Sequence, residues 1–106
     1  MPDSDLQDLR KRIDELNVRL LETLQERAEV VLAISRIKEE IGMQSHDPRR
    51  EEEMLRKLTR ASSGPFGPAE LRDVFRAVFR ASLALQERER DELQEDGRRR
   101  AGGKAT

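Results

Sequence analysis

The chain has 106 residues, of which 41% are charged and only 3% aromatic, and its formal net charge is -1. This length allows one small domain, and the composition is typical of a helical protein with wide solvated faces and a thin aliphatic core. The even mixture of charge signs makes nucleic acid and anionic membranes poor candidate partners, and the lack of cysteine excludes disulfides and thiolate chemistry.

The first segment, Ser4 to Ile41, predicts one amphipathic helix, because two sets of residues recur every seven positions without an interrupting Pro or Gly. The first set is Leu6, Ile13, Leu20, Arg27, Ile34 and Ile41, and the second is Leu9, Leu16, Thr23, Val30 and Ile37. We call these positions the seam. Ser4 and Gln7 have the spacing of a capping box, and Gly42 is a natural C-terminal cap. Arg27 is the exception in the seam, since a cation stands where Leu or Ile belongs.

The length of this helix predicts an oligomer. At 1.5 Å per residue it would extend about 57 Å, whereas a compact domain of about 100 residues has a radius of gyration of about 13 Å. The helix must therefore overhang its own fold, and an apolar seam along its full length needs another chain to cover it. We expect an intertwined homodimer.

Two further helices follow in chain order. Asp47 and Pro48 signal the start of a helix from Pro48 to about Ala61, because Asp is a preferred N-cap and Pro is favoured at the first helical position. Pro68 opens a third helix that runs to about Leu93. The segment from Asp96 onward has no periodicity, which predicts disorder.

The predicted fold is therefore all-α, with three helices of which the N-terminal one is very long. We expect one domain over residues 1–93 and a disordered tail or linker over residues 94–106. The N-terminus has no apolar core of the signal-peptide kind and no segment approaches the length of a membrane span, so we expect a soluble, cytoplasmic protein.

Polar residues occupy positions that should belong to the core. Lys38 follows Arg27 by eleven residues and so faces the same side of the helix, while Ser82 and Gln86 interrupt the apolar stripe of the third helix. Buried cations need anionic partners. Two interpretations are open: an internal salt bridge, with Arg27 paired to Glu51, or a pocket for a small dianion.

Three stretches of the chain together resemble a known family. They are LRKRIDELNVRLLETLQERAEVVLAISRIK, HDPRREEEML and FRASLALQ, and over Leu6 to about Glu87 they resemble the all-helical AroQ class of chorismate mutases. The resemblance implies an entwined dimer of three-helix subunits. It also implies conversion of chorismate to prephenate, a step of aromatic amino acid biosynthesis, without a covalent intermediate, a cofactor or a metal.

The resemblance further implies an active site made of eight residues: Arg10, Arg27, Lys38, Asp47, Arg50, Glu51, Ser82 and Gln86. Chorismate carries two carboxylates, which arginines hold by paired, charge-assisted hydrogen bonds, so the three arginines are candidates for substrate binding. Lys38 and Gln86 are candidate donors to the ether oxygen, on which negative charge builds, and with Arg27 they form the catalytic set. Asp47 and Glu51 would bind the ring hydroxyl, and Ser82 would lie near a carboxylate.

Arg10 cannot share a pocket with Arg27 of the same chain, because it lies about 25 Å away along the helix and roughly 100° round it. If two long helices cross antiparallel, Arg10 of one chain reaches the Arg27 of the other. The active site would then be built from both chains.

A different class of function is also open. The GPF stretch before the third helix and the sequence FRASLALQE look like the mutase-like domain that is fused ahead of DAHP synthase in some bacteria. The chain would then be a regulatory domain that binds prephenate or chorismate, with DAHP synthase as a partner and the tail as a linker. A purely structural helical module is disfavoured, because it leaves the inward polar residues unexplained.

Overall fold

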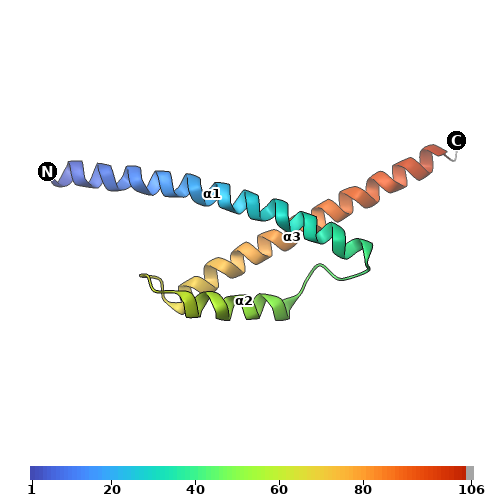
Figure 1. The fold of residues 1–106 in the computed structure, drawn as a ribbon. Coiled ribbons are helices and arrows are strands. Elements are labelled where there is room, and N and C mark those ends of the chain that lie inside the picture. The colour runs from blue at the N-terminus through green and yellow to red at the C-terminus, as the bar shows by residue number, and fades with distance from the viewer. Residues whose placement is uncertain (105–106) are drawn as a thin grey trace.

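The computed structural model describes residues 1–104, which form three helices and no strand (Figure 1). They are α1 (Pro2–Glu40), α2 (Pro48–Ala61) and α3 (Pro68–Lys104). The all-α fold with one very long N-terminal helix is confirmed, although α3 is nearly as long as α1. No helix within these residues is both long and apolar enough to cross a membrane.

Helix α1 begins two residues earlier than the sequence predicts. Its N-cap is Met1, which makes no side-chain cap hydrogen bond, and Pro2 occupies the first turn, where its missing N–H costs nothing. Ser4 therefore lies inside the helix, and the predicted capping box is wrong. The other end is as expected: Gly42 has φ +74°, which favours glycine, and its N–H donates to the Glu39 carbonyl at 3.2 Å.

Helix α2 has the predicted bounds. Asp47 caps it, since its carboxylate accepts a hydrogen bond from the Arg50 backbone N–H at 3.1 Å. Leu55 anchors α2 on α3 and is 3% exposed. At the edge of this contact the Arg72 guanidinium donates to Glu52 at 3.1 Å, and this hydrogen bond lowers the pKa of the Glu52 carboxyl. Apolar packing around Leu55 and the Arg72–Glu52 ion pair thus both join α2 to α3.

Helix α3 continues past the predicted end at Leu93 to Lys104. The prediction of disorder from Asp96 onward is therefore wrong for residues 96–104, and the last two residues of the expected tail lie outside the described residues. None of residues 90–102 is buried, so packing does not hold this part of the helix. Arg99 pairs with Glu95 at 3.0 Å in an i, i+4 contact, one of the local interactions that stabilise an exposed helix. The boundary proposed after residue 93 falls inside a continuous helix.

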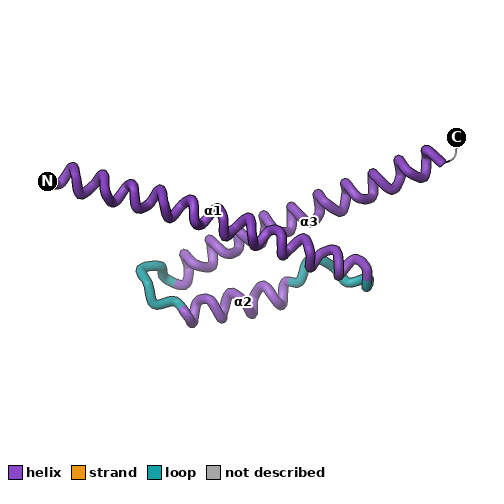
Figure 2. The backbone as a smooth tube through the Cα atoms, turned by 45° about the horizontal axis from the view of Figure 1, so that its top comes forward, coloured by secondary structure: helices purple, strands orange, loops and turns teal. Residues whose placement is uncertain are grey.

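Within residues 1–104, α1 and α2 each pack on α3 and not on one another (Figure 2). Where α1 crosses α3, the small side chain of Ser35 is buried, and Arg36 is paired with Glu89 at 2.6 Å. Helix α3 is thus the central element, with α1 on one side and α2 on another. The space between α1 and α2 is bridged by their connecting loop.

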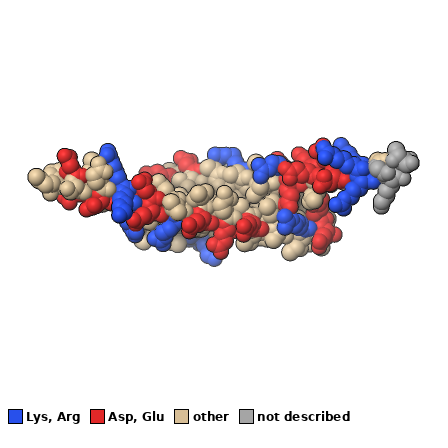
Figure 3. Space-filling model, turned by 90° about the horizontal axis from the view of Figure 1, so that it is seen from above, with Lys and Arg blue, Asp and Glu red and all other residues tan. Residues whose placement is uncertain are grey.

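The single chain is too open for its length. Its radius of gyration is 19.8 Å and its extents are 74 × 32 × 16 Å. Its accessible surface is 9106 Å², whereas a compact monomer of this mass has about 6,100 Å². Charges of both signs are interspersed along the molecule (Figure 3), but the apolar seam of α1 is bare: Ile13 is 57% exposed and Leu20 58%. The predicted overhang is present, and within residues 1–104 every seam residue except Arg27 is exposed.

Candidate active site

The space between α1 and α2 holds a pocket of about 660 Å³, part of which is open to solvent. Its wall comes from both helices, from the loop that joins them and from α3. The lining residues are Arg27, Val31, Lys38, Ser45, His46, Asp47, Arg50, Glu51, Met54, Phe79, Ser82, Leu83 and Gln86. Seven of the eight site residues that the resemblance implies are in this set.

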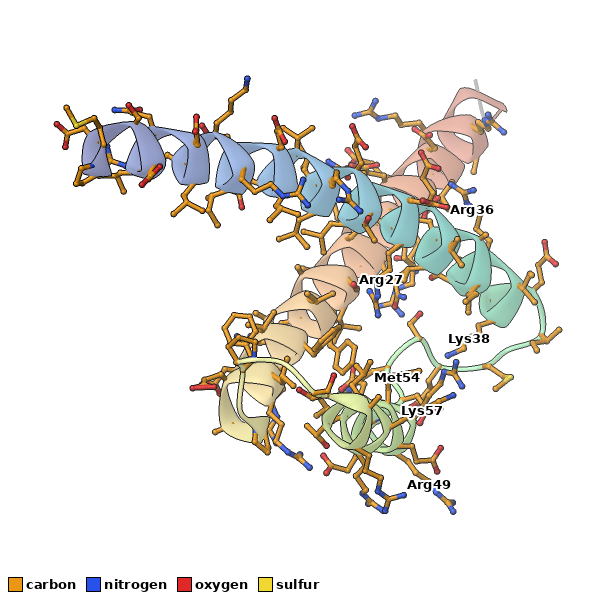
Figure 4. All side chains as sticks on the ribbon, turned by 60° about the vertical axis from the view of Figure 1, so that its left-hand side comes forward. Arg27, Arg36, Lys38, Arg49, Met54 and Lys57 are labelled. Atoms are coloured by element: carbon orange, nitrogen blue, oxygen red, sulfur yellow. The ribbon has the colours of Figure 1, made fainter. Side chains whose placement is uncertain are left out.

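Helix α1 supplies two cations to the pocket. Arg27 and Lys38 are both partly buried, and in Figure 4 both extend from α1 towards the side on which Met54 of α2 lies. Arg49, one residue before a pocket residue, points away from it. The eleven-residue spacing therefore does bring Arg27 and Lys38 to one face, as the helical period predicts.

The loop and the first turn of α2 supply the acidic groups. Asp47 is fixed by its role as the N-cap, which uses one of its carboxylate oxygens. Glu51 lies one turn further, partly buried, with an oxygen 3.7 Å from Nε2 of His46. With Arg50 included, the pocket contains three permanent cations and only these two carboxylates. An excess of positive charge suits an anionic ligand.

Arg27 does not pair with Glu51. Its Nη1 donates to Ser82 Oγ at 2.6 Å, and its guanidinium carbon lies 5.5 Å from the centre of the Phe79 ring. Within residues 1–104, no carboxylate forms a salt bridge with Arg27. The internal salt bridge that the sequence left open is therefore not the arrangement of the folded chain. The physical reason is that α1 packs on α3, so that Arg27 meets α3 side chains first.

Arg10 is the one implied site residue that is absent from the pocket. It is exposed on the N-terminal half of α1, which projects away from the other helices (Figure 1). This agrees with the expectation that Arg10 cannot serve the pocket of its own chain.

Sequence reasoning missed the apolar wall of the pocket, above all Phe79. The sequence could have indicated it, because Phe79 lies three residues before Ser82 and both therefore lie on one face of α3. His46 also lines the pocket. Within residues 1–104, no group of three or more His, Cys, Asp or Glu side chains could hold a metal ion. The cations of the pocket, Arg27, Lys38 and Arg50, are suited to hold a small anion and to donate hydrogen bonds to it.

Comparison with known proteins assigns the family. Residues 9–87, which include all eight implied site residues, match the family model described as chorismate mutase type II. The chain belongs to the chorismate mutase type II family. Two solved structures are similar to it, and both are of chorismate mutase from Thermus thermophilus. Form II has a TM-score of 0.77 and 44% sequence identity, and the match covers 78% of this chain and 94% of that one. Form I has a TM-score of 0.71 and 43% identity, over 73% and 96% of the two chains.

Curated chorismate mutase relatives are longer proteins. A bifunctional chorismate mutase/prephenate dehydratase of Aquifex aeolicus is 33% identical over 88 residues, which are 79% of this chain and 24% of that protein. The protein of the same name from Pseudomonas aeruginosa is 32% identical over 93 residues, or 82% of this chain and 26% of that protein. The chain thus spans about a quarter of the length of these relatives.

Proposed function

We propose that this chain catalyses the conversion of chorismate to prephenate. The observation that carries the proposal is the pocket itself, in which Arg27, Lys38 and Arg50 from two helices converge and Arg27 has no carboxylate partner among the described residues. The reaction is a rearrangement within one molecule: an ether C–O bond breaks as a C–C bond forms. The protein therefore has to supply binding, orientation and electrostatic stabilisation, and no nucleophile.

Binding would rest on the arginines. Each of the two substrate carboxylates can accept two parallel N–H hydrogen bonds from a guanidinium, and Arg27 and Arg50 stand on different elements around the pocket. Holding both carboxylates would fix the folded conformer in which the two carbons that join lie close together. Restricting a flexible substrate in this way lowers the barrier by removing the entropy of orientation from the reaction step.

Electrostatic stabilisation would come from Lys38 and Gln86. They line the pocket from α1 and α3, so a substrate between those helices can meet both. Negative charge builds on the ether oxygen as its bond to carbon breaks, and donors at that oxygen stabilise the transition state more than the substrate. Asp47 and Glu51 would accept from the ring hydroxyl. Ser82 would lie beside the carboxylate that Arg27 binds.

The missing arginine would come from a second copy of the chain. The bare seam of α1 and the excess surface of the single chain support an antiparallel pairing of two α1 helices. Arg10 of each copy would then reach the pocket of the other. The proposed active form is a homodimer with two shared sites.

The regulatory alternative rests on the GPF stretch and the sequence FRASLALQE alone. The curated relatives pair a chorismate mutase with a prephenate dehydratase in their names, and none of those compared names a DAHP synthase. An assay of chorismate absorbance decides between catalysis and mere binding. We expect the purified chain to consume chorismate catalytically and to yield prephenate; binding of chorismate without turnover would overturn the proposal in favour of the regulatory role.

The rate should be insensitive to pH between 6 and 8. Gln86 is an amide and keeps its donor protons over this range, so we expect kcat to stay within about twofold. Gln86→Glu provides the contrast, because a carboxyl group donates only when protonated. Above the ordinary pKa of a Glu carboxyl, about 4.3, its rate should fall by about tenfold per pH unit. A wild-type profile as steep as that of the variant would contradict the role given to Gln86.

A further inference from the structure

The charge of Arg27 is held in the pocket by neutral groups. The side chain is partly buried, so water does not fully solvate it. Its contacts are the Ser82 hydroxyl and the face of the Phe79 ring. A buried cation normally requires an anion to offset the loss of hydration, and within the described residues none is paired with Arg27.

Ser82 is arranged as an acceptor towards Arg27. A hydroxyl has one proton and two lone pairs, and the proton of Ser82 is directed to the Val78 carbonyl oxygen at 2.8 Å. Its lone pairs therefore face Arg27 Nη1 at 2.6 Å. Because Arg carries five N–H donors, this hydrogen bond uses only one of them.

Phe79 supplies the second contact. Phe79 is 8% exposed, and its ring packs against that of Phe75, with 6.4 Å between the ring centres and 47° between the planes. The ring is thus fixed before any ligand arrives. The negative face of an aromatic ring attracts a cation within about 6 Å, and the attraction is greater where water is partly excluded. The Arg27 carbon, at 5.5 Å, is within that range.

We propose that Phe79 is a positioning residue for the reaction, acting through Arg27. Together with Ser82 it forms a neutral seat that fixes the guanidinium in the pocket without neutralising it, so that a substrate carboxylate does not have to displace an internal anion. This inference rests on the proposed function, which it deepens. It also explains why Glu51 can face His46 and leave Arg27 unpaired.

The test compares Phe79→Leu with Phe75→Leu. Both remove one ring from the same face of α3, but only Phe79 lies under Arg27. We expect Phe79→Leu to raise KM for chorismate by about fivefold to thirtyfold, the range that a partly desolvated cation–π contact supports. Phe75→Leu should change KM by less than about twofold. A merely structural role would lower the amount of active protein, and with it kcat, while KM stayed the same.

A second measurement uses the unaltered protein and needs no turnover. We expect nuclear Overhauser contacts between the Phe79 ring protons and the Arg27 side chain in the absence of ligand. This measurement tests the proposal even if Phe79→Leu fails to fold. Absence of these contacts, or equal KM values for the two variants, would contradict the proposal that Phe79 positions Arg27. A wild-type protein that shows the contacts but does not turn over chorismate would instead refute the proposed function and leave the seat intact.

Discussion

Replacing Arg27 by alanine is expected to lower kcat/KM for chorismate by a factor of about 100 or more, equivalent to about 3 kcal/mol of transition-state stabilisation. Arg27 lines the pocket, and no carboxylate of residues 1–104 forms a salt bridge with it. If Arg27 binds a substrate carboxylate as proposed, removing it would leave that carboxylate without a charged partner in a partly dry site. Steady-state kinetics of the purified variant measure this loss.

Arg36→Ala is the matched control for Arg27→Ala. Arg36 is also on α1 and also contacts α3, through Glu89, but it does not line the pocket. We expect its kcat/KM to stay within about threefold of wild type, because Arg36 does not touch the pocket and its side chain, 58% exposed, makes an ion pair that contributes little to stability. Near-normal turnover in Arg27→Ala, or an equal loss in both variants, would contradict the account of the pocket as an anion site.

Replacing Ile13 by aspartate is expected to dissociate the dimer and abolish turnover at micromolar concentration. Ile13 lies in the α1 seam and is 57% exposed in the single chain, so in an antiparallel pair it would be covered by the second copy. A carboxylate at that position would have to lose its hydration on association. The isolated chain then lacks Arg10 in its pocket. Light scattering for mass and the chorismate assay for activity measure the two effects.

Val18→Asp is the control for Ile13→Asp. Val18 is 55% exposed, nearly the same as Ile13, but it falls outside the seam. We expect this variant to keep the mass of a dimer and the wild-type rate. A monomeric mass for the wild-type chain, or full activity in a monomeric Ile13→Asp variant, would refute the shared site.

The sequence predicted a helix boundary correctly where one or two residues determine it locally. Asp47 and Pro48 set the start of α2, because an N-cap acceptor and a residue without an N–H satisfy the first turn by themselves. Ser4 misled, because Pro2 had already started the helix and left Ser4 inside it. The end of α3 misled too. The loss of apolar periodicity from Asp96 onward indicated a stop, but i, i+4 pairs such as Glu95 with Arg99 are interactions within the helix and need no periodic apolar face.

The pocket was predictable only in part, because the sequence gives the faces of each helix but not how the helices pack. The helical period places Arg27 and Lys38 on one face of α1, and it does the same for Ser82 and Gln86 on α3. The period does not say which helix lies opposite. Because α1 packs on α3 and not on α2, Arg27 meets Ser82 and Phe79 instead of Glu51. The resemblance, and not the spacing, indicated Arg50 and Arg10.

The most direct test of the shared site is complementation between two inactive variants. Arg10→Ala and Arg27→Ala should each be inactive alone, because each dimer then carries the same defect in both sites. If Arg10 serves the other copy, a mixed dimer has one site with both defects and one with neither. Random re-pairing of equal amounts makes half of the dimers mixed, so unfolding the variants together and refolding them should restore about a quarter of wild-type activity. No gain on mixing would contradict a pocket completed by the second copy.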